Sequence, residues 1–277
     1  MEIKEKSKLG SPELAKLVIA SSVNKIIDRV IKRFTFRCIK SLLHSISWLE
    51  STPDLWLHVG LIGLGLGVII LLAETLHRRV SSSAELARKV VHIGTGNVIL
   101  VAWWLDIPAW VGISASIIAS IVALLSYYIP FLPGINSVGR KSLGTFFYAI
   151  SIGVLVAWFW PLQQYQYAAL GILVMTWGDG LACIIGQQFG QHPYEIWGMK
   201  KSWEGSSAMA LTSYAVSSLI LLSAQGNVWQ TWLFPVAIAF VATALEAFSK
   251  LGIDNLTVPL GSAALAFFLS QLFPLIS

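Results

Sequence analysis

Charged residues are scarce in this chain of 277 residues: Asp, Glu, Lys and Arg together make up 12% of it, whereas apolar residues make up 56%. A soluble domain usually carries about 25% charged residues, so an ordinary soluble enzyme is excluded. The mean hydropathy of +0.71 points the same way. The composition therefore predicts an integral membrane protein.

Cysteine is nearly absent as well, because Cys38 and Cys183 are the only two. Two thiols are too few for a disulfide framework or a cysteine zinc site. The first 50 residues lack the uninterrupted apolar core of a cleavable secretory signal. Internal repeats are not visible either, so an inverted-repeat transporter has no support from sequence symmetry.

Long apolar runs are what the chain has in quantity. Windows of roughly 17–25 apolar residues mark membrane-spanning helices. The fold class predicted is all-α: a polytopic helical membrane protein with about eight (seven or eight) transmembrane helices. The predicted spans are 55–76, 90–105, 109–129, 144–160, 167–189, 205–224, 232–251 and 256–275.

The N-terminal region differs from the rest. Between Leu14 and Ile46 apolar residues recur at helical spacing, and Lys and Arg largely occupy the other side. This pattern predicts a basic amphipathic helix lying on an anionic membrane surface, with a partner-binding or poorly ordered arm as the alternative. The predicted domains are a basic arm, 1–54, and a transmembrane catalytic domain, 55–277.

Positive charge is confined to one side of the predicted topology. All 19 Lys and Arg lie in the N-terminal tail or in four alternate loops, 77–89, 130–143, 190–204 and 250–255. By the positive-inside rule these loops face the cytoplasm, or the stroma in a plastid. We expect membrane lipid, and no nucleic acid, as the partner of this charge.

An aspartate within the fifth span is the most informative residue. Asp179 is flanked by Gly178 and Gly180, and an ionised carboxylate inside a bilayer costs several kcal/mol unless something binds it. We interpret Asp179 as a Mg²⁺ ligand, because carboxylate oxygens suit that ion. The two glycines would let a phosphate approach closely, although ordinary helix packing is the alternative for them.

A basic loop follows that span within a few residues. Lys200 and Lys201 offer point charges to phosphate oxygens. Ser202 is a candidate for nucleotide binding or for capping the next helix, and Glu204 for binding metal with Asp179 or for capping. A positive-inside flank explains the lysines but not the acid and the glycines beside them.

Polar residues also open the second span. Arg88 and Lys89 are candidates for phosphate binding. His92 lies four residues after Arg88 and shares its helical face. It is a candidate acid–base group, phosphate donor, or simply a satisfied helix histidine.

Two further polar stretches lie near the same membrane face. The run 134–142 looks like a P-loop, but Arg140 is inserted before Lys141 and no strand precedes it, so a Walker site is rejected and a basic phosphate-contacting loop is predicted. Glu246, a second intramembrane carboxylate, is a catalytic candidate. Asp254 and Asn255 could cap the last helix, and Asn255 is also a candidate for nucleotide binding.

Five of these stretches, in this order, resemble the polyprenol kinase family, which contains phytol, farnesol and dolichol kinases, and the resemblance is strongest to phytol kinases of cyanobacteria and plastids. The stretches are RKVVHIGTG (88–96), NSVGRKSLGTFFY (136–148), WGDGLACIIGQQFG (177–190), KKSWEGS (200–206) and DNLTVPL (254–260).

The resemblance implies an enzyme that transfers the γ-phosphoryl group of CTP, with Mg²⁺, to the hydroxyl of a long isoprenoid alcohol. Phytol is the expected substrate, and phytyl phosphate would enter tocopherol and related prenyl lipids. The expected location is a cyanobacterial or plastid membrane, with the active site on the cytoplasmic or stromal side. Asp179 and Glu204 are expected at the metal, Lys200 and Lys201 at the triphosphate, and His92 or Glu246 as the group that accepts the alcohol proton.

Alternatives stay open at this point. Farnesol, geranylgeraniol or dolichol could be the alcohol. The Asp179 and KKSWEGS stretches are also similar to those of phosphatidate cytidylyltransferases, which would transfer a cytidylyl group to a lipid phosphate. A transporter is disfavoured, because the intramembrane acids lie toward the basic loops only.

Overall fold

A computed structural model gives the fold of the chain and describes residues 53–79, 84–128 and 143–274. The predicted N-terminal arm as far as residue 52, and Arg140 and Lys141, lie outside the described residues. The described part contains eight helices and one two-stranded sheet. In chain order these are α2 (Pro53–Arg79), α3 (Ala84–Trp104), α4 (Ala109–Tyr128), α6 (Gly144–Phe159), α7 (Tyr165–Phe189), β1 (Pro193–Ile196), β2 (Met199–Ser202), α8 (Trp203–Gln225), α9 (Trp229–Phe248) and α10 (Asp254–Leu272).

Each predicted apolar span corresponds to one of these helices, which confirms the all-α polytopic membrane fold. Within the described ranges, six helices are long and apolar enough to cross a membrane, and α6 is a shorter apolar helix. The main shift is in α3, which begins at Ala84 instead of residue 90. The residues in between, Ala-Glu-Leu-Ala-Arg-Lys, are strong helix formers that extend the helix beyond its apolar part.

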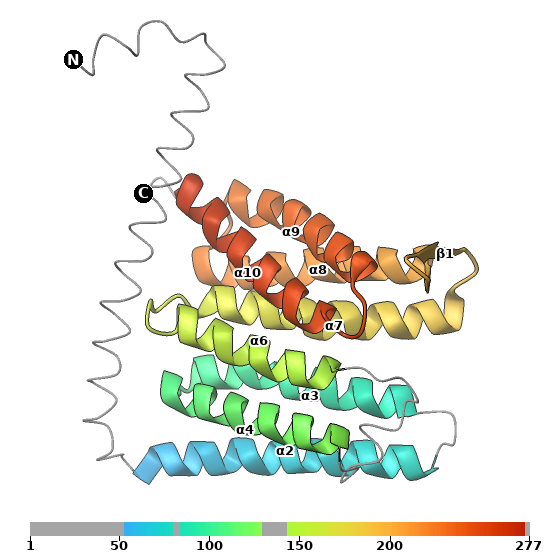
Figure 1. Ribbon diagram of the computed structural model, residues 1–277. Coiled ribbons are helices and arrows are strands. Elements are labelled where there is room, and N and C mark those ends of the chain that lie inside the picture. Colours follow the sequence, from blue (N-terminus) through green and yellow to red (C-terminus); the bar gives the residue numbers. More distant parts are fainter. Residues whose placement is uncertain (1–52, 80–83, 129–142, 275–277) are drawn as a thin grey trace, which may run out of the picture.

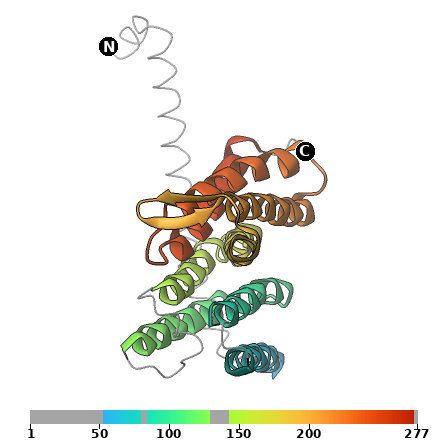
Figure 2. The same ribbon diagram turned by 90° about the vertical axis from the view of Figure 1, so that its right-hand side faces the viewer.

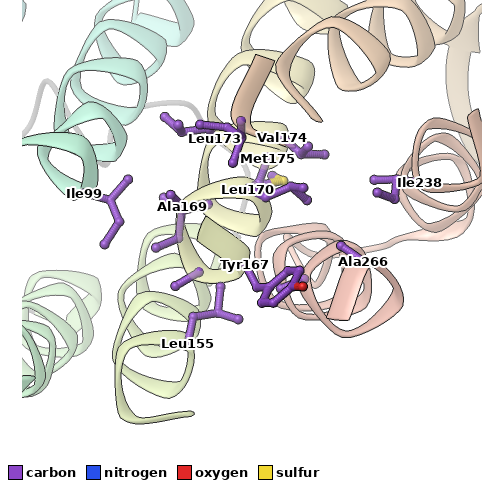
Figure 3. Packing of buried hydrophobic residues seen from close by; sticks show 14 of the residues in the cluster. Ile99, Leu155, Tyr167, Ala169, Leu170, Leu173, Val174, Met175, Ile238 and Ala266 are labelled. Carbon is purple, nitrogen blue, oxygen red and sulfur yellow. The ribbon is translucent and has the colours of Figure 1, made fainter. Parts of the chain in front are cut away.

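The helices lie side by side with their long axes roughly aligned, and α7 runs through the middle of the bundle (Figure 1). It packs against α8, α10, α3 and α6. Small residues permit this close packing: a Cβ added to Gly171 would meet the backbone oxygen of Pro259 in α10 at 2.3 Å. Figure 3 shows the buried core around α7: Ile99 of α3 lies on the side of Ala169, and Ile238 of α9 lies on the side of Leu170 and Met175.

The outer helices present apolar side chains outward. In α2 only 6% of the apolar window is buried inside the protein, against 67% in α7. Leu57, Leu64 and Leu71 of α2 are exposed. In a bilayer, lipid tails cover such an apolar surface. The helix tolerates this because its backbone hydrogen bonds are satisfied internally.

Helices α3 and α4 are consecutive in the chain but barely touch. Helix α3 packs on α2 and α7, whereas α4 packs on α6. This separation leaves the space that forms the cavity described below.

The loop predicted at 190–204 contains a β-hairpin that the sequence analysis missed. Strands β1 and β2 are antiparallel, with Pro193 opposite Ser202. Trp197 and Gly198 have φ of 50° and 77°, and positive φ at both central residues is typical of a type I′ hairpin turn. The hairpin lies at one end of the bundle (Figure 2) and carries Lys200 and Lys201.

Candidate active site

One large cavity is lined by most of the predicted site residues that the structure describes. It has a volume of about 2030 Å³, which exceeds the roughly 300–1,000 Å³ of a typical small-molecule site. One end is polar and is lined by Arg88, Lys89, His92, Tyr148, Asp179, Lys200, Lys201, Glu246, Asp254 and Asn255. The other end is apolar and is lined by Ile99, Ala102, Ile107, Pro108, Gly112, Val156 and Trp160. The cavity therefore combines a charged compartment with an apolar one.

A buried ion pair joins α3 to α7 at the polar end. The Lys89 ammonium donates to the Asp179 carboxylate, and its Nζ lies 3.4 Å from the Asp179 backbone oxygen. The Lys89 and Asp179 side chains are 5% and 13% exposed. Lys89 reaches Asp179 because α3 starts early enough to include it. The costly intramembrane carboxylate thus has a cationic partner.

His92 lies beside this pair and lines the cavity. Its Nε2 is 3.7 Å from Asp179 Oδ2 and has no hydrogen-bond partner among the described residues. The imidazole lies against the Tyr148 ring at 4.1 Å between centroids. Tyr148 is fixed in turn by a 2.7 Å hydrogen bond between its hydroxyl and Thr176 Oγ1. A buried imidazole nitrogen without a hydrogen-bond partner can accept a proton.

The two predicted lysines of β2 have different surroundings. Lys201 donates to the Glu246 carboxylate and, at 2.6 Å, to the Glu246 backbone oxygen. This second ion pair joins the hairpin to α9. Lys200 also lines the cavity, but its ammonium has no hydrogen-bond or ion-pair partner in the described part of the chain. Lys200 is therefore available to an anionic ligand.

The start of α10 contributes a third carboxylate to the polar end. Asp254 lines the cavity together with Asp179 and Glu246. Its side chain does not cap α10, whose N-cap is Ile253. Asn255 lines the same cavity and donates to Asp254 Oδ1 at 3.2 Å and to the Gly252 oxygen at 3.2 Å.

Ser202 and Glu204 have helix-end roles in the structure. Ser202 is the N-cap of α8, and its Oγ accepts from the Gly205 N–H at 3.1 Å. The Glu204 carboxylate lies 2.6 Å from His192 Nδ1 and accepts from the His192 backbone N–H. It is not among the residues that line the cavity with Asp179. The structure therefore does not bring together the predicted metal pair of Asp179 and Glu204.

The glycines on either side of Asp179 are in close helix contacts. A Cβ on Gly178 would meet Met209 Sδ at 2.6 Å, and one on Gly180 would meet Ile93 Cδ1 at 2.9 Å. Both glycines are buried, and neither lines the cavity. These two glycines allow α7 to pack closely on α8 and α3. Nucleotide binding by them stays a prediction.

The described residues contain no group of three or more His, Cys, Asp or Glu side chains arranged to hold a metal ion. Magnesium bound with a nucleotide needs fewer protein ligands, because one or two carboxylates act together with phosphate oxygens. Asp179 and Asp254 both face the polar end, so this donor chemistry fits Mg²⁺ carried in with a triphosphate. Arg88 lines the same end.

Comparison with known proteins decides the family. The chain is 50% identical over 213 residues to the phytol kinase of Synechocystis, an alignment that covers 77% of this chain and 91% of that protein. The chain belongs to the phytol kinase family. It is 29% identical over 230 residues to phytol kinase 1 of Arabidopsis thaliana, covering 73% of this chain and 72% of that protein. A probable phytol kinase of Triticum aestivum is 29% identical over 219 residues, covering 71% of each chain.

No family model matches the chain, and no solved structure matches it. The predicted resemblance to phytol kinases is confirmed by these relatives, which include a cyanobacterial protein and chloroplast proteins. This member of the phytol kinase family is accordingly a multi-pass membrane protein of the cyanobacterial and chloroplast type.

Sequence reasoning missed two residues of this candidate site. Tyr148 is the last residue of the stretch 136–148. The only feature of the sequence that could have indicated it is its position about one helical turn after the basic loop. Asp254 was interpreted as a capping residue, yet it lines the cavity. Both side chains meet the site through packing between helices distant in sequence.

Proposed function

We propose that the protein phosphorylates phytol with CTP as the phosphoryl donor, at the membrane face where the basic loops lie. The observation that carries the proposal is the single cavity with a charged end and an apolar end. A prenyl alcohol has an apolar tail and one hydroxyl, and a nucleoside triphosphate is strongly anionic. The cavity offers a matching environment to each, and the names of the relatives supply phytol as the alcohol.

We assign the triphosphate to the polar end. Lys200 is the cation without a protein partner in the described part of the chain, and Lys201 and Arg88 line the same compartment. Lysine binds phosphate as a point charge. Asp179 and Asp254 would hold Mg²⁺ together with phosphate oxygens, and the ion would neutralise charge on the triphosphate.

We assign the proton acceptor to His92 in preference to Glu246. The Glu246 carboxylate is already paired with Lys201, whereas His92 Nε2 has no hydrogen-bond partner in the described residues. His92 also lies next to Thr95 and Gly96, which line the cavity toward its apolar end. An alcohol whose tail occupies that end would present its hydroxyl near His92.

The reaction then follows from these positions. His92 takes the proton of the phytol hydroxyl while the alcohol oxygen forms a bond to the γ-phosphorus. The bond from that phosphorus to the β–γ bridging oxygen breaks, and CDP leaves. Little covalent work falls to the protein, because such transfer depends mainly on positioning and neutralisation of charge.

The test uses purified protein in nanodiscs with Mg²⁺, phytol, and CTP, UTP or ATP in separate reactions, with products identified by mass. We expect phytyl phosphate and CDP, with CTP the best donor. Pyrophosphate and a cytidylyl lipid would instead show cytidylyl transfer and refute the proposal. Asp179→Asn protein prepared identically reports the background rate.

A further inference from the structure

We propose that Trp160 and the turn between α3 and α4 close the apolar end of the cavity and set the longest prenyl chain that the enzyme accepts. The inference rests on the proposed function, because it assigns the apolar end to the tail of the alcohol. It adds a specificity determinant at the end of the cavity farthest from the charged residues that line it.

The distance from the polar end to this floor follows from helix geometry. Tyr148, beside His92, and Trp160, the C-cap of α6, both line the cavity. Positions 148 and 160 are twelve residues apart in sequence, which corresponds to about 18 Å of helix. Across the cavity, Ala102 near the end of α3 lies on the floor side, and His92 lies on the polar side. A tail anchored by a hydroxyl near His92 therefore has a defined depth available.

The floor is held in place by hydrogen bonds. Trp160 Nε1 donates to the Ile107 oxygen at 2.8 Å. The turn has the two bonds of a Schellman motif: Ile107 N donates to Ala102 O at 2.9 Å and Asp106 N donates to Trp103 O at 3.3 Å. Asp106 has a φ of 49°, which Asp tolerates better than most residues.

Packing makes the floor resistant to a longer tail. Trp160 and Ile107 are 7% and 4% exposed, and Pro108 completes the turn. Closely packed interiors yield little to an added group. A chain one isoprene unit longer than phytol would have to displace the indole or break its bond to Ile107.

A side exit is the competing arrangement. Leu66 of α2 and Ala119 of α4 also line the cavity, so a long tail could leave between these helices into the lipid. In that case the floor would not affect the choice of alcohol. The experiment separates the two arrangements.

The experiment measures competition between alcohols in one vesicle, with phosphorylated products quantified by mass spectrometry. With the alcohols at equal concentration and at low conversion, the product ratio equals the ratio of kcat/KM values and does not depend on the amount of active enzyme. Two variants enlarge the floor, Trp160→Leu and Ile107→Ala, and one fills it, Ala102→Leu. Trp158→Leu is the matched control, because Trp158 lies on the same helix but stacks on Phe159 at 4.8 Å and does not line the cavity.

The competing alcohol is a polyprenol one isoprene unit longer than phytol. The enlarging variants should raise the ratio of its phosphorylated product to phytyl phosphate by about tenfold or more. Ala102→Leu should raise the ratio of farnesol to phytol by a similar factor, and Trp158→Leu should leave both ratios unchanged. Unchanged ratios in all three floor variants, with wild type active on phytol, overturn the floor and leave the proposed function intact. Wild type inactive on every alcohol overturns the proposed function and the floor with it. The filling variant keeps the test decisive if Trp160→Leu does not fold.

Discussion

Removing one partner of the Lys89–Asp179 pair should destabilise the protein and abolish its activity, whereas removing both should restore stability alone. Both side chains are nearly buried, at 5% and 13% exposed. Breaking a buried ion pair by removing one partner typically costs about 3–5 kcal/mol, because the other charge is left uncompensated. We therefore expect that loss for Lys89→Met and for Asp179→Leu.

The double variant, Lys89→Met with Asp179→Leu, separates structure from chemistry. Replacing a buried ion pair by apolar residues of similar size is often neutral for stability. The double variant should therefore unfold near the wild-type temperature, with a coupling free energy of about 3 kcal/mol or more in the double-mutant cycle. It should still lack phosphoryl transfer, since the proposed mechanism needs the Asp179 carboxylate.

The assay combines thermal unfolding in detergent with the phosphorylation rate on phytol. Thr243→Ala is the control, because it removes a single hydrogen bond, 2.8 Å to the Ala239 oxygen, away from the cavity. It should cost about 1 kcal/mol and keep full activity. An active double variant would refute the reasoning, because the pair would then be structural only.

Three further changes test other parts of the site. Lys200→Ala should raise KM for CTP by about tenfold or more, because a hydrogen bond to a charged group contributes about 1.5–3 kcal/mol. Lys250 lies over the Trp197 ring, and Lys250→Ala should leave KM unchanged. Equal effects of the two variants in steady-state kinetics would contradict the assignment. His92→Gln should lower kcat by about 10²–10⁴-fold with little change in KM, and retained kcat would exclude His92 as the base. Gly96→Ala should destabilise the protein by about 1–3 kcal/mol, since the added Cβ would meet Thr176 Oγ1 at 2.0 Å. Gly65 has open space around it, so Gly65→Ala should unfold at or above the wild-type temperature. Equal thermal shifts for the two variants would contradict the packing described for α3.

The helices could be predicted from the sequence because a bilayer imposes a simple rule on them. A chain must satisfy its backbone hydrogen bonds within the membrane, so an apolar run long enough to cross is a helix. The hairpin at 193–202 was missed because its strands are short and polar, and only the Trp197–Gly198 turn marks it.

The pairing of charges within the site was beyond sequence reasoning. Asp179 was singled out by the cost of burying a charge, but its partner Lys89 lies 90 residues earlier in the chain. The same holds for Lys201 and Glu246, which are 45 residues apart. Local pattern identifies which residues carry charge, whereas helix packing decides which of them meet.

Glu204 shows the opposite case. Its place near two lysines suggested a metal ligand. In the structure Glu204 lies in the first turn of α8, where its carboxylate contacts His192. An acid in the first turn of a helix is stabilised there in any case, so the sequence alone could not separate the two roles.

The most direct measurement follows the γ-phosphorus of CTP in nanodiscs containing phytol. With γ-labelled CTP and Mg²⁺, the account predicts that the label appears in phytyl phosphate with wild-type protein, and that Lys200→Ala and Asp179→Asn lower the rate while Lys250→Ala does not. Label released as pyrophosphate, or transferred equally fast by the Asp179→Asn variant, would contradict the account.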